Sequence, residues 1–289
     1  MREDNNVKGI IIMLLSMVGF ALADTLVKVS ADFMSPPQIA FYLMAGALIM
    51  FFLIAKLSGE VLDFSNAFSP IVLLRYLAEV IGMFAMVLAL AHVPLSTVGA
   101  ITQAAPIVVV LGAVLFLGEK ISWRRGVSIM VGFLGVLLIV QPGTIAFDTN
   151  VFWAILALIG LSVRDLTTRL ISSDIGSASL ATYTMLAACP FSLAWVFYNG
   201  DPIIPIDVNW WIILPMIFIG SLGYWLLIVS LRIAPISVVM PFRYSRIIIM
   251  VVLGMVVFSE RPNALVYLGA ALIIASGVYI MWREQRVKG

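Results

Sequence analysis

Eight charged residues lie inside stretches of the sequence that are otherwise apolar. They are Asp24, Lys28, Arg75, Glu79, Arg164, Asp165, Arg243 and Arg246. If these stretches cross a lipid bilayer, each charge costs about 2.5–3.5 kcal/mol on insertion. Such residues usually face the interior of a helical bundle, where they bind ligands, carry protons or pair with one another. They are therefore the first candidates for the chemistry of this protein.

Three acid–base pairs share a four-residue spacing. They are Asp24 with Lys28, Arg75 with Glu79, and Asp165 with Arg169. This spacing places both partners on one face of a helix, so each pair can neutralise itself and let its helix enter the membrane. Alternatively, the first and third pairs, which lie toward opposite mouths of the protein, act as two gates. The spacing is compatible with both interpretations.

Two further arginines have no acidic residue on their own segment. Arg243 and Arg246 are three residues apart and flank Tyr244. The five basic and three acidic side chains named at membrane depth leave a formal charge of +2. A guanidinium group can hold a carboxylate through two hydrogen bonds. We therefore expect the two arginines to contact an anionic group of a substrate, or else to pair with Glu79 or Asp165 of another helix.

Proline residues interrupt two segments at a similar depth. Pro241 precedes the two arginines, and Pro106 follows Thr102 and Gln103. Proline removes a backbone hydrogen bond, and broken helices in both halves of a membrane protein indicate a binding site. Trp225 and Tyr224 could stack on an aromatic substrate, although interior aromatic residues usually pack the core. The expected substrate-binding residues are Arg243, Arg246, Tyr244, Gln103, Thr102, Arg75, Glu79, Arg164 and Trp225.

The composition excludes an ordinary soluble domain. Of the 289 residues, 63% are hydrophobic and 11% are charged, with a mean hydropathy of +1.13; soluble domains are about half apolar and a quarter charged. A membrane helix takes about 20 residues, and the apolar segments are 9–30, 36–57, 69–90, 94–117, 123–140, 151–171, 178–198, 210–231, 235–258 and 264–282. The sequence predicts an all-α integral membrane protein with ten transmembrane helices and no room for a soluble catalytic or nucleic-acid-binding domain.

The distribution of basic residues predicts how the chain is oriented. If the N-terminus lies inside the cell, eleven Lys and Arg residues lie near the inner face and only Arg261 lies near the outer face. Because Lys and Arg concentrate on the cytoplasmic side of membrane proteins, we expect a multi-pass protein of the inner membrane with both termini in the cytoplasm.

The two halves of the chain match at a constant offset of 141 residues. Matched pairs include Gly19 with Gly160, Asp24 with Asp165, Gly82 with Gly223, Pro94 with Pro235, and Glu119 with Glu260. Five helices in each half is an odd number, so the second copy enters the membrane from the opposite side. We therefore expect two inverted repeats, residues 1–145 and 146–289, with a site between them.

Several motifs resemble those of the drug/metabolite transporter superfamily of the EamA type. In the first half they are residues 90–96 (LAHVPLS), 103–106 (QAAP) and 117–120 (LGEK), and in the second half residues 234–237 (APIS) and 258–261 (FSER). The resemblance implies ten helices in two inverted five-helix repeats, with a cavity lined mainly by helices 1, 3, 4, 6, 8 and 9. Relatives export amino acids or import riboflavin, S-adenosylmethionine and other metabolites. Many carry an arginine in helix 2, where this chain has Phe41-Tyr42-Leu43, so the resemblance does not imply a substrate contact from that position here.

Together these features predict a secondary transporter that moves a small metabolite by alternating access. One histidine and one cysteine exclude the usual zinc sites, and the absence of a phosphate-binding P-loop leaves protons or the substrate's own gradient as the driving force. We expect no metal and no cofactor; the lipid bilayer and the metabolite are the expected partners, and a homodimer is left open. A membrane-embedded enzyme would need a catalytic cluster, and a non-transporting sensor a signalling domain; neither is evident in the sequence.

Overall fold

The computed structural model describes residues 2–60, 67–105, 108, 123–140, 148–171, 175–204, 209–233 and 240–288. Its helices are α1 (Arg2–Ser30), α2 (Pro36–Leu57), α3 (Pro70–His92), α4 (Leu95–Thr102), α6 (Trp123–Val140), α7 (Val151–Leu170), α8 (Ser177–Asn199), α9 (Trp210–Ile233), the 3-10 helix η2 (Met240–Tyr244), α11 (Ser245–Phe258) and α12 (Ala264–Lys288). Across these ranges the secondary structure is helical, without strands.

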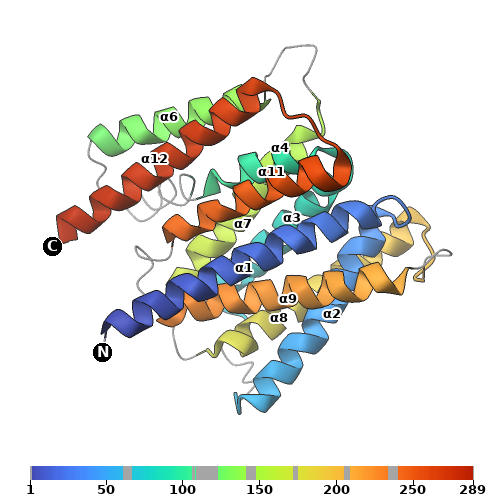
Figure 1. Ribbon diagram of the computed structural model, residues 1–289. Coiled ribbons are helices and arrows are strands. Elements are labelled where there is room, and N and C mark those ends of the chain that lie inside the picture. Colours follow the sequence, from blue (N-terminus) through green and yellow to red (C-terminus); the bar gives the residue numbers. More distant parts are fainter. Residues whose placement is uncertain are drawn as a thin grey trace.

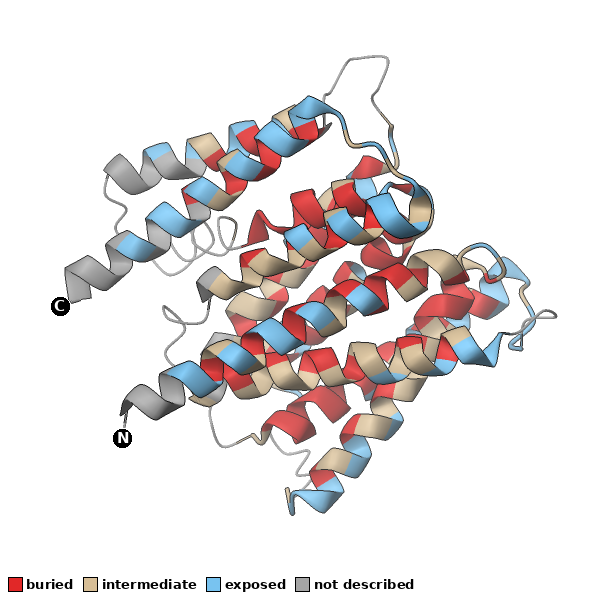
Figure 2. Cartoon of the chain, in the orientation of Figure 1, coloured by how far each residue is buried: buried red, intermediate tan, exposed pale blue. Residues whose placement is uncertain are grey.

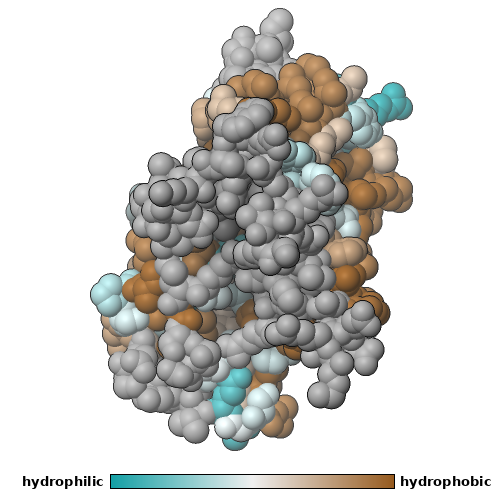
Figure 3. All heavy atoms as spheres, turned by 90° about the vertical axis from the view of Figure 1, so that its left-hand side faces the viewer, coloured by the Kyte–Doolittle hydropathy of each residue, from teal (hydrophilic) through white to brown (hydrophobic). Residues whose placement is uncertain are grey.

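Six of the described helices are long and apolar enough to cross a membrane, namely α1, α2, α3, α7, α8 and α9. Their outward faces carry large apolar side chains such as Ile49, Leu77 and Phe191, and the buried residues concentrate on the inward faces (Figure 2). Hydrophobic side chains also cover the flanks of the molecule when it is viewed from the end that carries both chain termini (Figure 3). An apolar exterior of this kind suits contact with lipid, and the protein is a multi-pass helical membrane protein.

The helix boundaries agree with the apolar segments of the sequence, with two qualifications. The segment 94–117 is described only through α4 and the few residues that follow, so Pro106 lies outside the described residues. The segment 235–258 is not one continuous α-helix, because it contains the 3-10 helix η2 before α11. This break coincides with Pro241, as expected from the hydrogen bond that a proline cannot donate.

Helices from the two halves of the chain pack in pairs. Helix α1 packs against α9, α3 against α7, α2 against α8, α4 against α11, and α6 against α12 (Figure 1). In the first two of these pairs the helices meet at glycine residues. A Cβ atom added at Gly19 would lie 3.2 Å from the Cα atom of Gly223, and one added at Gly160 would lie 2.7 Å from the Cα atom of Gly82. Small residues thus let α1 approach α9, and α7 approach α3, at backbone distance.

Helices α2 and α8 are joined at both ends by polar contacts from the chain that follows the partner helix. The Glu60 carboxylate, after α2, accepts hydrogen bonds of 2.9 Å from both the backbone N–H and the hydroxyl of Ser179 in the first turn of α8. At the other end, the hydroxyl of Ser35, the N-cap of α2, donates to Asp201, which follows α8. A carboxylate of the opposite half therefore lies at each helix N-terminus, where it suits the partial positive charge: Glu60 accepts backbone N–H groups of α8 directly, and Asp201 accepts from the hydroxyl that caps α2.

A third carboxylate ties the chain after α11 to the start of α4. Glu260 accepts hydrogen bonds from the backbone N–H of Leu95 at 2.6 Å and of Ser96 at 3.1 Å, and from the Ser96 hydroxyl at 2.7 Å. Because these N–H groups belong to the first turn of a helix, they have no partner within α4 itself. The contact holds α4 against the second half of the chain.

Candidate substrate site

A cavity of about 120 Å³ lies between the two halves of the chain. It is lined by side chains from α1, α2, α3, α4, α7, α8, α9, η2 and α11. Its polar lining residues are Asp24, Glu79, Thr102, Gln103, Arg164, Ser221, Tyr224, Arg243 and Arg246, and much of the remainder is apolar, including Met17, Phe20, Met83 and Met185. Such a mixture of apolar walls and a few convergent polar groups is typical of a small-molecule site.

One charged contact in the cavity joins α1 to α11. Arg246 donates to the Oδ2 atom of Asp24 through Nε at 3.1 Å and through Nη2. The guanidinium also lies over the ring of Phe20, 5.2 Å from its centroid, a distance that allows a cation–π interaction. Asp24 therefore holds the arginine from one side while the aromatic ring supports it from another.

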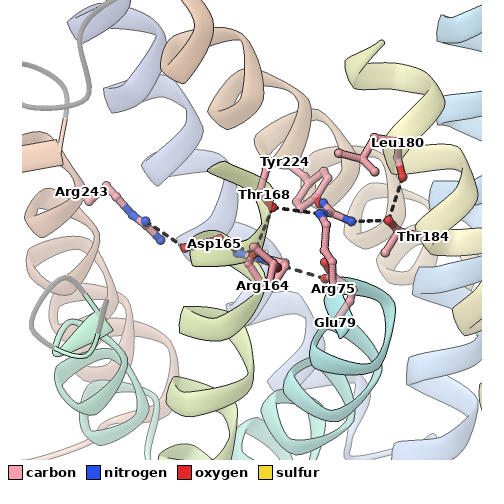
Figure 4. Close-up of polar contacts among 10 residues, drawn as sticks. Arg75, Glu79, Arg164, Asp165, Thr168, Leu180, Thr184, Tyr224 and Arg243 are labelled. Atoms are coloured by element: carbon pink, nitrogen blue, oxygen red, sulfur yellow. Dashed lines mark hydrogen bonds and ion pairs between the residues drawn. The ribbon is translucent and has the colours of Figure 1, made fainter. Parts of the chain in front are cut away.

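A second charged contact runs from η2 through α7 to α3. Asp165 accepts from Arg243 Nη1 at 3.1 Å on one carboxylate oxygen, and from Arg164 Nε at 2.9 Å and Nη2 at 2.7 Å on the other. Arg164 Nη1 lies 3.3 Å from Glu79 Oε1. Figure 4 shows these four side chains as a continuous row. Two arginines alternate with two carboxylates, so this row has no net formal charge; we call it the four-residue ion chain.

Arg75 and Lys28, the other two basic residues at this depth, are held by neutral groups. Arg75 is 1% exposed and donates to the hydroxyls of Thr168 at 2.8 Å, Tyr224 at 2.6 Å and Thr184 (Figure 4). Lys28 donates to the backbone carbonyls of Val93 at 2.7 Å and Leu90 at 3.4 Å, where α3 ends. Neither residue lines the cavity; Arg75 lies behind Tyr224, which does.

These contacts correct the pairing expected within single helices. Asp24 pairs with Arg246 rather than with Lys28, and Glu79 pairs with Arg164 rather than with Arg75. Four-residue spacing makes a same-helix contact geometrically feasible, but Lys28 and Arg75 donate to neutral groups instead. The planar guanidinium of an arginine on another helix contacts each carboxylate in their place. The expected pairing of Asp165 with Arg169 cannot be assessed in the same way, because the side chain of Arg169 lies outside the described residues.

The excess positive charge also lies elsewhere than expected. Arg243 pairs with Asp165, and Arg246 pairs with Asp24. The first of these ion pairs agrees with the alternative that the two arginines pair with acidic residues of other helices. With three arginines and three carboxylates balanced in and around the cavity, the formal excess of +2 belongs to Arg75 and Lys28. Helix packing had to be known before these partners could be assigned.

The remaining expected site residues divide into two groups. Thr102 and Gln103 line the cavity; the amide of Gln103 donates to the carbonyl of Arg243 at 2.7 Å, and Thr102 bonds back to the carbonyl of Val98. Tyr244 is buried among apolar side chains, and Trp225 packs against the cluster between α2 and α8. Neither aromatic residue is part of the lining.

Of the two neighbouring aromatic residues that could stack on a substrate, Tyr224 lines the cavity and Trp225 does not, and further lining residues were not expected. Tyr224 faces the cavity and bonds to Arg75, whereas its neighbour Trp225 does not face it. Adjacent residues on a helix point about 100° apart, so at most one of the two aromatic side chains can face a given neighbour. Phe20 and Ser221 also line the cavity, and nothing in their type distinguishes them from other apolar or small residues of a membrane helix.

The fold and the cavity define a multi-pass helical membrane protein that encloses a polar, charge-balanced site between two halves. A model of the EamA-like transporter family matches this chain twice, over residues 7–141 and again over residues 149–282. The chain belongs to the EamA-like transporter family. This confirms the resemblance seen in the motifs and identifies a membrane transporter for a small molecule rather than an enzyme.

Individual relatives carry different substrates. The S-adenosylmethionine uptake transporter of Rickettsia prowazekii is 25% identical over 96% of this chain and 94% of that protein. The riboflavin transporter of Brucella anthropi is 30% identical over 70% of this chain and 73% of that protein. The pseudopaline exporter CntI of Pseudomonas aeruginosa is 25% identical over 93% and 94%. A solved structure superposes with a TM-score of 0.61 over 98% of this chain and 99% of that one at 16% identity, which shows a common fold.

Proposed function

We propose that the protein is a secondary transporter of the inner membrane that moves a small metabolite through the cavity by alternating access. The observation that carries this proposal is the cavity itself. Helices from both halves line the cavity, and its lining includes Asp24, Glu79, Arg164, Arg243 and Arg246. Charged side chains inside a membrane are costly, so those that occur there usually have a function. Rocking of one half against the other would expose such a site to each face in turn.

We propose further that the chain consists of ten transmembrane helices in two inverted repeats, residues 1–145 and 146–289. The offset of 141 residues relates Gly19 to Gly160 and Gly82 to Gly223. The contact between Gly19 and Gly223 and the contact between Gly160 and Gly82 are thus equivalent under an exchange of the two halves. Under the same exchange of halves, α1 corresponds to α7 and α9 corresponds to α3, so the packing of α1 on α9 is equivalent to that of α7 on α3. The family model also matches each half separately. All three observations support a twofold relation.

The same offset relates the carboxylates that lie at the N-terminal ends of α8 and α2. Glu60 and Asp201 are 141 residues apart, and each accepts a hydrogen bond at the N-terminal end of the helix that belongs to the other half. A mutual arrangement of this kind supports an inverted relation, because each helix ends where its partner begins.

The proposed orientation places both termini in the cytoplasm. It rests on the eleven basic residues near one face against Arg261 near the other. Reporter fusions after Gly289 and at Ser58 test it: both should report a cytoplasmic location. A periplasmic signal from either fusion would contradict the orientation.

The cavity favours a substrate with both polar and apolar parts. Arg243 and Arg246 present guanidinium groups whose carboxylate partners can be exchanged for an anionic group of the substrate, and Thr102 and Gln103 offer neutral hydrogen bonds at the same level. Tyr224 adds an aromatic ring to the lining. We assign substrate contact to these residues. Glu79 and Arg164 complete the polar side of the site, while Arg75 supports Tyr224 from behind.

Counterflow in proteoliposomes tests the proposed function. The purified full chain is reconstituted, vesicles are loaded with unlabelled S-adenosylmethionine, riboflavin or an amino acid, and uptake of the labelled compound is followed without any imposed gradient. Exchange of at least one compound, absent from protein-free vesicles, is the expected result. No exchange with any member of a broad metabolite panel, by protein that remains folded, would contradict the proposal.

A further inference from the structure

The carboxylate of Glu79 has one oxygen without a partner. Its Oε1 atom lies 3.3 Å from Arg164 Nη1. Its Oε2 atom is buried and accepts no hydrogen bond from any residue that the structure describes. The residue is 1% exposed and lines the cavity between the two halves. An unsatisfied carboxylate oxygen therefore borders the proposed substrate site.

The other two acidic residues of this region are held much more firmly. Asp165 accepts three hydrogen bonds from two arginines, using both of its oxygens. Asp24 accepts two from Arg246. Glu79 has a single contact, and it is shared, because Arg164 gives its two shorter bonds to Asp165. Of these three carboxylates, Glu79 is the one whose negative charge is least compensated.

An ionised carboxylate away from water is costly unless it is paired and hydrogen-bonded. Binding a proton removes the charge of Glu79 and turns the unsatisfied acceptor into a hydroxyl that can point into the cavity. Arg164 keeps Asp165 as its partner in that state, so protonation leaves no buried arginine unpaired. Protonation of Asp165 would instead remove the counter-charge shared by Arg164 and Arg243.

We propose that Glu79 is a proton-binding site of the transporter, with the proton carried on Oε2. The proton arrives from the water on one side of the membrane and leaves to the water on the other; no other bond is made or broken. This use of the proton rests on the transport function proposed above. With Glu79 neutral, the four-residue ion chain changes from zero to a formal +1, so the protonated state binds an anionic group more strongly than the ionised state does.

The groups that surround Glu79 agree with this assignment. On its own helix α3 lies Arg75. The other elements around the cavity contribute Asp24 from α1, Thr102 at the end of α4 and Gln103 directly after it, Arg164 and Asp165 from α7, Tyr224 from α9, Arg243 from η2 and Arg246 from α11. Helices α2 and α8 contribute apolar lining such as Phe51 and Met185. The arginines stay charged at all relevant pH values, and each of the two aspartates accepts at least two hydrogen bonds from them, whereas the Oε2 atom of Glu79 accepts none from the described residues.

Infrared difference spectroscopy tests the site without knowledge of the substrate. The purified full chain in lipid nanodiscs is compared between alkaline and acidic pH, and the carbonyl stretching band of a protonated carboxylic acid is recorded. We expect a band at the high-frequency end of the range, typical of a carboxyl group with few hydrogen bonds. It should be lost in Glu79→Gln and kept in the control Asp148→Asn, whose carboxylate accepts from the backbone N–H of Asn150 just before α7.

Isotope labelling keeps the test decisive if Glu79→Gln does not fold. In the wild-type chain the band should shift when glutamate carries ¹³C in its side-chain carboxyl group and should stay in place when aspartate does. A band that follows the aspartate label, that persists in folded Glu79→Gln, or that is absent from the wild type would overturn the assignment. If the band does not come from Glu79 but counterflow continues, only the proton site is refuted. If the band comes from Glu79 but no counterflow is found, only the proposed transport function is refuted.

Discussion

The ion pair between Asp24 and Arg246 offers a quantitative test of the site's structure. The pair joins α1 to α11 inside the cavity, with Arg246 13% and Asp24 10% exposed at their side chains. Removing one partner of a buried pair leaves the other charge uncompensated and costs about 3–5 kcal/mol. Asp24→Asn and Arg246→Gln should therefore each lower the free energy of unfolding by about that amount.

The double variant should behave differently from the sum of the two single variants. With both charges gone no buried charge is left without a partner, so the double variant should lose about 3–5 kcal/mol or less, instead of the roughly 6–10 kcal/mol that additivity predicts. Unfolding can be followed by titration with a denaturing detergent, using a thiol-reactive fluorescent dye on Cys189, the single cysteine, which is partly buried.

A double-mutant cycle between two residues that are not in contact serves as the control for additivity. Ser58→Ala, on the exposed end of α2, combined with Asp24→Asn should be additive because the two sites share no partner. If the Asp24→Asn and Arg246→Gln losses add in the same way as in the control, the two residues do not form a pair, and the described geometry of the cavity is wrong.

Three further predictions follow from contacts on other elements. Glu260→Gln should lower the free energy of unfolding by about 1–3 kcal/mol, because α4 loses charge-assisted hydrogen bonds at its N-terminus; an unchanged unfolding curve would contradict the capping contact. Gly160→Ala should cost about 1–3 kcal/mol through overpacking, since its Cβ would lie 2.7 Å from Gly82, whereas Gly220→Ala, whose Cβ would meet its nearest neighbour at 3.4 Å, should change stability little. Arg243→Gln should weaken the apparent affinity of counterflow by roughly 10- to 150-fold if its guanidinium holds an anionic group, and an unchanged half-saturation concentration would remove it from the site.

Hydropathy and helix-breaking residues predicted the positions of several of the described helices. The apolar segments 36–57 and 123–140 coincide with α2 and α6. Ser35 followed by two prolines marks the start of α2, because serine caps a helix and proline is tolerated in the first turn. Local rules of this kind act within a few residues, so they can be read from the chain without knowledge of the packing.

The partners of the buried charges could not be predicted in the same way. The sequence places Asp24 four residues from Lys28, but the choice of Arg246 depends on α1 and α11 lying side by side, more than two hundred residues apart in the chain. The balance of charge in the cavity depends on the same packing. The sequence indicated which residues carry the charges and their depth; the helix arrangement decided which of them meet.

The most direct test of the account is whether substrate occupies the cavity between the two halves. Ser221 lies on α9, lines the cavity and is 5% exposed; it can be changed to Cys in a Cys189→Ser background. The rate at which a small water-soluble thiol reagent labels Ser221→Cys in proteoliposomes is then measured with and without a compound that gives counterflow, with Ser58→Cys as the exposed control. The account predicts that the compound slows labelling of Ser221→Cys and leaves Ser58→Cys unchanged. Equal labelling rates at Ser221→Cys, while counterflow of the same compound persists, would contradict it.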